Sequence, residues 1–235
     1  LSRLTAPARG DEAREITVTE TAAIKSHFFR CLDGCEAGTE PYNHWFLADV
    51  FPEDVSGAIR DLPIAPAEIE ETKGKRETNN ASRVFFSVEN RARYDVCRKV
   101  AEALQDPATV ARLEEVCGVE LGGGSLRIEY CQDTDGFWLE PHTDIGAKLF
   151  TMLVYFSTDP EAGGWGTDIY DREMSHVATA PYAFNHGIIF IPGTDTWHGF
   201  RKRPINGVRK AIIVNYVKDE WRARHELAFP ERPVG

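Results

Sequence analysis

The sequence predicts a mainly β fold with flanking helices, and two patterns lead to this prediction. From Gly122 to Val217, short runs rich in β-branched and aromatic residues follow one another, separated by Gly, Pro, Asp and Asn. Before this stretch, longer runs carry apolar residues at the spacing of an amphipathic helix. The chain is therefore expected to be an α+β protein built on a double-stranded β-helix, or jelly roll.

Eight strands are expected in the second part of the chain. They are predicted at Ser125–Cys131, Gly136–Pro141, Lys148–Phe156, Thr167–Tyr170, Ser175–Ala180, Gly187–Ile191, Trp197–Lys202 and Val208–Val217. Eight short strands at this spacing suggest the double-sheet architecture shared with cupins.

The first part of the chain is expected to contain two strands and four helices. A helix should begin near Pro52, a residue favoured at helix starts, because Val55, Ile59 and Leu62 follow at helical spacing. The strands are predicted at Tyr42–Phe51 and Arg83–Val88, and the other helices at Thr19–Cys31, Tyr94–Leu104 and Pro107–Cys117.

The length of 235 residues suits one domain. Residues 1–40 are polar and weakly patterned, so we expect an N-terminal extension packed on the core. Residues 41–235 are expected to form a single domain. Within it, residues 63–80 combine two prolines with a charge run, which predicts a solvated loop able to act as a lid.

The composition argues against several classes of protein. Five cysteines, an odd number, indicate a reducing compartment, with the cytoplasm as the default, rather than a disulfide scaffold. Cys31 and Cys35 have the spacing of half a zinc site, but no second pair follows. The net charge of -10 disfavours nucleic acid and anionic membranes as partners. The longest nearly apolar run, Leu149–Phe156, is too short to cross a bilayer.

A candidate metal site begins at the end of the predicted strand Gly136–Pro141. His142 and Asp144 follow it two residues apart, and this spacing turns both side chains to one face of a strand. Two histidines and one carboxylate form the facial triad that binds non-haem iron and leaves positions open for other ligands. His198 is the best candidate for the second histidine, because it precedes the strand that begins near Arg209.

His142-x-Asp144, His198 and Arg209, in this order, resemble the Fe(II)- and 2-oxoglutarate-dependent dioxygenases of the prolyl-hydroxylase-like branch. The resemblance extends from about His44 to about Tyr216. It implies that His142, Asp144 and His198 bind Fe(II), with 2-oxoglutarate and O2 as co-substrates. It also implies hydroxylation of an unactivated carbon, coupled to oxidative decarboxylation of 2-oxoglutarate.

The same resemblance assigns the co-substrate pocket. Arg209 would hold the far carboxylate of 2-oxoglutarate through its planar guanidinium, Tyr155 would share that carboxylate, and Tyr130 resembles a further pocket tyrosine. Ala211 departs from the hydroxyl residue often found two positions after the arginine. One hydrogen bond to the co-substrate must therefore come from elsewhere or be absent.

The resemblance leaves the substrate open. Candidates to face it are Trp138, Ile128 on the strand face shared with Tyr130, and Asn215 on the face shared with Arg209. We expect a small molecule, because no separate peptide-binding module is visible; a protein hydroxylase of the prolyl type is the alternative.

Other interpretations of the same residues remain. A cupin-like hydrolase or isomerase could use the same ligands for zinc or manganese, and an inert binding module could keep the barrel alone. His186 is the rival to His198 as a ligand. Asn206-Gly207 favours a hairpin joining the last two strands, whereas the resemblance places those strands in facing sheets, which is the arrangement we expect.

Overall fold

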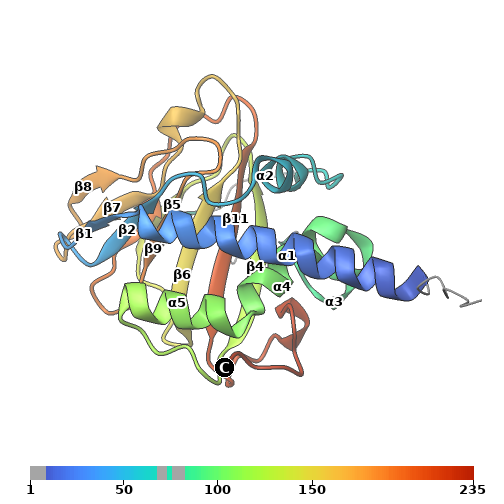
Figure 1. The fold of residues 1–235 in the computed structure, drawn as a ribbon. Helices are drawn as coiled ribbons and strands as arrows, with labels where there is room; N and C mark the ends of the chain where they lie inside the picture. The colour runs from blue at the N-terminus through green and yellow to red at the C-terminus, as the bar shows by residue number, and fades with distance from the viewer. Residues whose placement is uncertain (1–8, 68–72, 76–82) are drawn as a thin grey trace, which may run out of the picture.

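This computed structural model describes residues 9–67, 73–75 and 83–235, and in that part of the chain the strands form two antiparallel sheets (Figure 1). The main sheet has the order β1-β2-β9-β6-β11-β4-β3. Its strands span Glu36–Gly38 (β1), His44–Leu47 (β2), Gly187–Phe190 (β9), Lys148–Tyr155 (β6), Arg209–Val217 (β11), Ser125–Asp133 (β4) and Val84–Phe85 (β3).

The second sheet has the order β5-β10-β7-β8. Its strands span Leu139–His142 (β5), His198–Phe200 (β10), Asp168–Tyr170 (β7) and His176–Thr179 (β8). Side chains from both sheets share one buried cluster, so the sheets pack face to face. The jelly roll with flanking helices is thereby confirmed.

All eight strands predicted after Gly122 are present, with boundaries close to those expected. The arrangement at Asn206-Gly207 follows the jelly roll rather than the hairpin signal. β10 lies in the second sheet and β11 in the main sheet, where β11 pairs with β4 and β6. The long-range pairing of β11 thus outweighs the local turn propensity of Asn-Gly.

The helices span Arg9–Asp33 (α1), Glu53–Arg60 (α2), Val88–Arg93 (α3), Asp95–Gln105 (α4) and Pro107–Cys117 (α5), with short 3-10 turns at Ala162–Gly164 (η2) and Arg224–Glu226 (η3). The end of the strand predicted at Arg83–Val88 is wrong, because α3 begins at Val88. The Ser87 hydroxyl accepts a hydrogen bond from the Asn90 N–H, a cap that favours a helix start.

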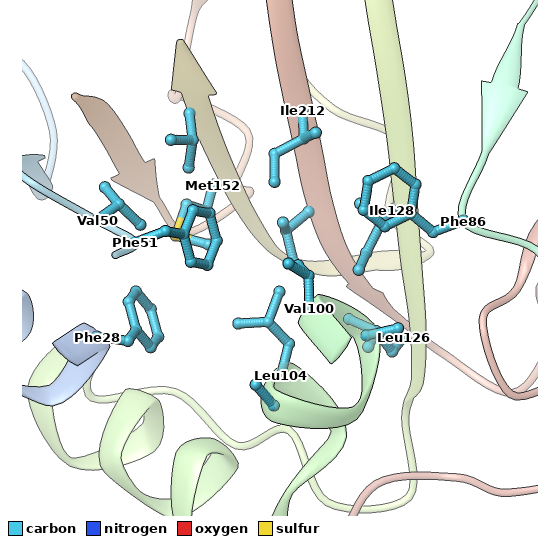
Figure 2. Close-up of a cluster of buried hydrophobic side chains, with 14 of the residues drawn as sticks. Phe28, Val50, Phe51, Phe86, Val100, Leu104, Leu126, Ile128, Met152 and Ile212 are labelled. Atoms are coloured by element: carbon cyan, nitrogen blue, oxygen red, sulfur yellow. The ribbon is translucent and has the colours of Figure 1, made fainter. Parts of the chain in front are cut away.

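The outer core lies between the main sheet and the helices. α1, α4 and α5 pack on one another, and α4 rests on β4. Figure 2 shows the buried side chains that meet there: Phe28, Val100 and Leu104 from helices, and Ile128, Met152 and Ile212 from strands. This layer is mainly apolar, so it stabilises the fold mainly by removing hydrocarbon from water.

The inner core fills the space between the two sheets. Leu153, Ile188 and Ala211 enter it from the main sheet, and Ile169 and Phe200 from the second sheet. This core is smaller than the outer core, and it leaves room for polar side chains at one end.

Three expectations concern the periphery. α1 contributes Ile24, Phe28 and Leu32 to the outer core, while the division into residues 1–40 and 41–235 stays a prediction. The proposed lid at residues 63–80 lies largely outside the described residues. None of the helices built from the described residues has the length and apolarity needed to cross a membrane.

Candidate active site

Two histidines stand opposite each other on neighbouring strands of the second sheet. His142 ends β5 and pairs with His198, which begins β10. Their ring centroids are 4.4 Å apart. His198 is buried against Phe190, whereas His142 is partly exposed. Strand pairing therefore brings together two residues that lie far apart in the sequence.

Both histidine rings are oriented by their own backbone. Nδ1 of His142 lies 2.8 Å from the carbonyl oxygen of Glu140, and Nδ1 of His198 lies 3.0 Å from that of Thr196. A carbonyl oxygen only accepts, so each Nδ1 donates its proton, and in this tautomer the lone pair lies on Nε2. Burial lowers the pKa of His198 to about 4, which keeps this ring neutral at pH 7.

Asp144 lies in the loop after β5, with its carboxylate buried. Its Oδ1 accepts a hydrogen bond from Lys148 Nζ at 2.5 Å, and its Oδ2 accepts one from the Thr151 hydroxyl at 2.6 Å. Burial alone would raise the pKa of this carboxyl. The charge of Lys148 and the hydrogen bonds from Lys148 and Thr151 outweigh burial and hold the pKa well below its usual range, so Asp144 is ionised.

The donor chemistry of this group fits a divalent metal, since two imidazole lone pairs and one carboxylate line a single pocket. Within residues 9–67, 73–75 and 83–235, however, no three His, Cys, Asp or Glu side chains are gathered closely enough to form a ready metal site. Asp144 differs from a metal ligand that is ready to bind, because one of its oxygens accepts a hydrogen bond from the Lys148 ammonium. The metal triad stays a prediction.

The pocket has a volume of about 260 Å³ and lies between the two sheets. Its lining ranges from buried to exposed residues. Arg209 and Thr167 are each 3% exposed, whereas Ile145 is 58% exposed. Leu153, Phe200 and Ile213 supply apolar walls near the buried residues. The pocket thus offers a ligand a desolvated inner end and an outer end that is open to solvent.

Arg209 provides the cation of the inner end. Its Nε donates to the Trp165 carbonyl oxygen at 2.7 Å and its Nη1 to Asp133 Oδ2 at 2.6 Å. The guanidinium carbon lies 4.6 Å from the Phe200 ring centroid. These contacts fix the guanidinium plane and leave Nη2 without a hydrogen bond to the described residues, so one edge of the fork is available to a ligand.

Tyr155 lies behind this end rather than in the pocket wall. It is fully buried and stacks on Tyr182, and its hydroxyl lies 2.8 Å from that of Thr167. Burial raises the pKa of Tyr155, so the phenol stays protonated. Thr167 lines the pocket itself. Thr167 was not among the pocket residues predicted from the sequence, although the prediction lacked a hydroxyl residue near Arg209, where Ala211 stands.

A charged network covers another part of the pocket. Arg127 is buried and donates to Glu226, Asn215 and Glu129 at 2.6, 3.0 and 3.1 Å. Arg83 forms a forked pair with the same Glu129. Arg127 and Glu129, charged residues buried at alternate positions of β4, therefore define the face that β4 turns to the pocket, and Asp133 lies farther along the same face.

No model of a known protein family matches the chain, and no curated protein matches it. Solved structures do. A prolyl-4-hydroxylase from Pseudomonas putida matches at a TM-score of 0.52 and 11% identity, over 81% of this chain and 92% of that one. The chain therefore has a prolyl-hydroxylase-like fold.

Two further structures agree with this prolyl-hydroxylase-like fold. A prolyl 4-hydroxylase from Phytophthora capsici matches at a TM-score of 0.54 and 11% identity, over 86% of this chain and 67% of that one. A prolyl hydroxylase from Trichoplax adhaerens, in complex with a hypoxia-inducible-factor peptide fragment, matches at 0.52 and 12% identity, over 88% and 95%. At such identities the likeness establishes the fold alone.

Two residues that were predicted from the sequence to line the pocket lie on the opposite face of β4. Tyr130 and Ile128 belong to the outer core, and the Tyr130 hydroxyl faces the Arg60 carbonyl oxygen at 3.5 Å. Their prediction as pocket residues is wrong. Alternation correctly placed them on one face of β4, but that face packs on the helices, and the pocket face carries Arg127 and Glu129.

Asn215 and Trp138 are near the pocket but do not line it. Asn215 lies on the inner face of β11, as expected, yet it is fully buried beneath Arg127 and Thr151, to which it is hydrogen bonded. The prediction that Asn215 contacts a substrate directly is therefore wrong. Trp138 packs its ring against Gly74, where a Cβ would come within 2.7 Å of it. His186 also lies outside the pocket, with Nδ1 3.1 Å from the Phe184 carbonyl oxygen.

Proposed function

We propose that this protein is a non-haem iron oxygenase that couples oxidative decarboxylation of 2-oxoglutarate to hydroxylation of an unactivated carbon. The observation that carries the proposal is that His142, Asp144, His198 and Arg209 all line one pocket. The prolyl-hydroxylase-like fold supports it.

Each side chain has a definite part in this proposal. His142 and His198 would offer Nε2 to Fe(II), and Asp144 would offer a carboxylate oxygen, so that the bound metal can activate O2. Arg209 would bind the far carboxylate of 2-oxoglutarate in a desolvated end, where a charge-assisted hydrogen bond is strong. Thr167 would supply the hydroxyl that Ala211 lacks. Leu153 and Phe200 exclude water from this end.

A hydrolase or isomerase with zinc or manganese is the alternative on the same ligands. It gives no role to a buried cation such as Arg209. We also propose a small molecule as substrate, because a cavity of about 260 Å³ must hold the co-substrate as well; a prolyl-type protein hydroxylase, which would insert one side chain, is the competing proposal.

Anaerobic titration with Fe(II), Zn(II) and 2-oxoglutarate tests the proposal. We expect one metal per chain and a weak visible charge-transfer band that needs both Fe(II) and 2-oxoglutarate. Asp144→Ala should abolish the band and iron-dependent release of succinate. The matched control is His186→Ala, which removes a histidine outside the pocket and should leave metal content intact.

Two results would contradict the proposal. Full oxygen-coupled turnover in Asp144→Ala would remove the triad from it. Tight binding of Zn(II) together with no effect of 2-oxoglutarate on the bound metal would favour the hydrolase alternative.

A further inference from the structure

Lys148 differs from the other cations of the pocket in the partner that it has. Among the described residues that line the pocket, the cations are Arg83, Arg127, Lys148 and Arg209. The three arginines are paired with acids outside the predicted metal triad: Arg83 with Glu129, Arg127 with Glu226 and Glu129, and Arg209 with Asp133. Lys148 is paired with Asp144, a predicted metal ligand.

A metal bound through the same oxygen competes with this pairing, because the metal cation and the ammonium repel each other. Lys148 Nζ lies 2.5 Å from Asp144 Oδ1, while Oδ2 is held by Thr151, which Asn215 in turn anchors at 2.9 Å. Oδ1 is therefore the oxygen that can change partner with the smaller rearrangement. A metal that takes it displaces an ammonium whose side chain is only 18% exposed, and a partly buried ammonium without a counter-ion is unfavourable.

We propose that Lys148 anchors a carboxylate of the substrate. In the metal-free protein its ammonium is the counter-ion of Asp144, and on metal binding it exchanges this carboxylate for one carried by the substrate. The inference rests on the proposed function and specifies its substrate class: an organic acid whose carboxylate lies within reach of the metal site.

Charge favours a carboxylate over a phosphate. One ammonium balances the single charge of a carboxylate, whereas a phosphate monoester carries roughly -1.5 to -2 at pH 7, and the arginines already have acidic partners. Ile145 and Trp221 line the pocket together with Lys148. They offer apolar contact to the remainder of such an acid.

The metal half of the exchange is tested with Zn(II), which is redox-silent. Calorimetry should give at least about tenfold tighter Zn(II) binding in Lys148→Met than in the wild type, since the competing ammonium is gone. The matched control is Lys210→Met: Lys210 Nζ donates to the Arg60 carbonyl oxygen away from the pocket, and its loss should change Zn(II) affinity less than twofold. Unchanged or weaker Zn(II) binding in Lys148→Met would overturn the exchange.

The substrate half is tested with protein saturated in Zn(II) and 2-oxoglutarate. The probes are N-acetyl amino acids and their primary amides, which differ only in the carboxylate, and short capped peptides with Glu or Gln at one position. The wild type should prefer the acid of one matched pair by at least about thirtyfold. Lys148→Met should lose the preference and Lys148→Arg should retain part of it.

The two sets of probes separate the sources of the carboxylate. Preference confined to the acetylated amino acids identifies a free small acid, and preference confined to the Glu peptide identifies an acidic side chain. Equal binding of acids and amides, or a preference that survives in Lys148→Met, would overturn the inference while leaving the proposed function intact. Failure of the wild type to bind Zn(II) or 2-oxoglutarate would instead refute the proposed function.

Discussion

Neighbouring residues of β4, β6 and β11 face opposite environments. On the helix side these strands present Ile128, Met152 and Ile212 to an apolar core, and on the pocket side they present Arg127, Thr151 and other polar groups. Arg127 and Ile128, neighbours on β4, have nearly the same burial although their side chains point to opposite faces. On the central strands, alternate residues therefore pack in the apolar core, and the residues between them face the pocket.

The difference concerns how burial is made favourable. The helix side buries hydrocarbon and needs no specific partners. The pocket side buries charges, which is unfavourable unless each is paired, and the pairs Arg209–Asp133 and Arg127–Glu226 meet this requirement. Stability should depend mainly on the first face and binding mainly on the second, and four substitutions test this division.

The largest effect is expected from Ile212→Ala on the helix side. Ile212 is fully buried, so its truncation leaves a cavity and should lower the free energy of unfolding by roughly 2 to 5 kcal/mol. The matched variant is Ile213→Ala, one residue along β11, which lines the pocket and is only partly buried. Denaturant unfolding should show the smaller loss for Ile213→Ala. Equal losses would break the division between the faces.

Arg209→Ala should act mainly on binding. It removes a charge-assisted hydrogen bond in a desolvated end, so affinity for 2-oxoglutarate should fall at least about thirtyfold. Arg209→Lys should recover only part of this affinity, because an ammonium lacks the planar fork. Calorimetry with a redox-silent metal measures both. Unchanged affinity in Arg209→Ala would assign the co-substrate to another cation.

Asp168 tests whether a buried charge outside the pocket lining can contribute to stability without contributing to binding. It lies on β7 away from the pocket, and its carboxylate accepts hydrogen bonds from Arg203, Thr179 and the Arg201 N–H at 2.6, 2.7 and 2.7 Å. Burial opposes its ionisation, but these partners outweigh burial and lower the pKa. Asp168→Asn should therefore cost about 2 kcal/mol of stability at pH 7.

The pH dependence of this cost has a definite sign. Because the pKa of Asp168 is lower in the folded protein, the contribution is complete above the ordinary carboxyl pKa of about 4 and is lost as the pH falls through the folded value. The difference in melting temperature between wild type and Asp168→Asn should shrink over that range. Asp219→Asn, which alters an exposed residue, is the control and should show almost no difference at any pH.

Thr167→Val is expected to have the smallest effect. It keeps the shape of the side chain and removes one hydroxyl at the inner end of the pocket, so 2-oxoglutarate affinity should fall about fivefold to tenfold. Thr167→Ser should bind almost as the wild type does. If Thr167→Val binds 2-oxoglutarate normally, the hydroxyl missing at Ala211 has no replacement at Thr167.

The strands after Gly122 could be predicted because turn residues separate them and each has the composition of a buried strand. The partner sheet of β10 and β11 could not be derived from local signals, since Asn206-Gly207 favours a hairpin that the fold does not contain. Only the resemblance gave the correct arrangement. The start of α3 was missed because β3 already ends at Phe85 and Ser87 caps a new helix directly afterwards.

Prediction of the pocket residues from the sequence was limited for a different reason. Alternation states which residues of a strand share a face, but a strand buried on both sides does not reveal which face meets the site. Tyr130 and Ile128 were placed in the pocket for this reason. The charges at Arg127, Glu129 and Asp133 carried the missing signal, because an ionisable residue in a buried strand requires partners that an apolar helix layer does not provide.

The position of β11 in the main sheet has a consequence for synthesis of the protein. β11 lies between β4 and β6, yet it follows both of them in the chain. While the ribosome makes residues 156–208, the residues of β4 and β6 have already been synthesised, but the strand that pairs between them has not. We expect folding to finish late, after β11 leaves the exit tunnel, with unpaired strand edges that chaperones must protect until then.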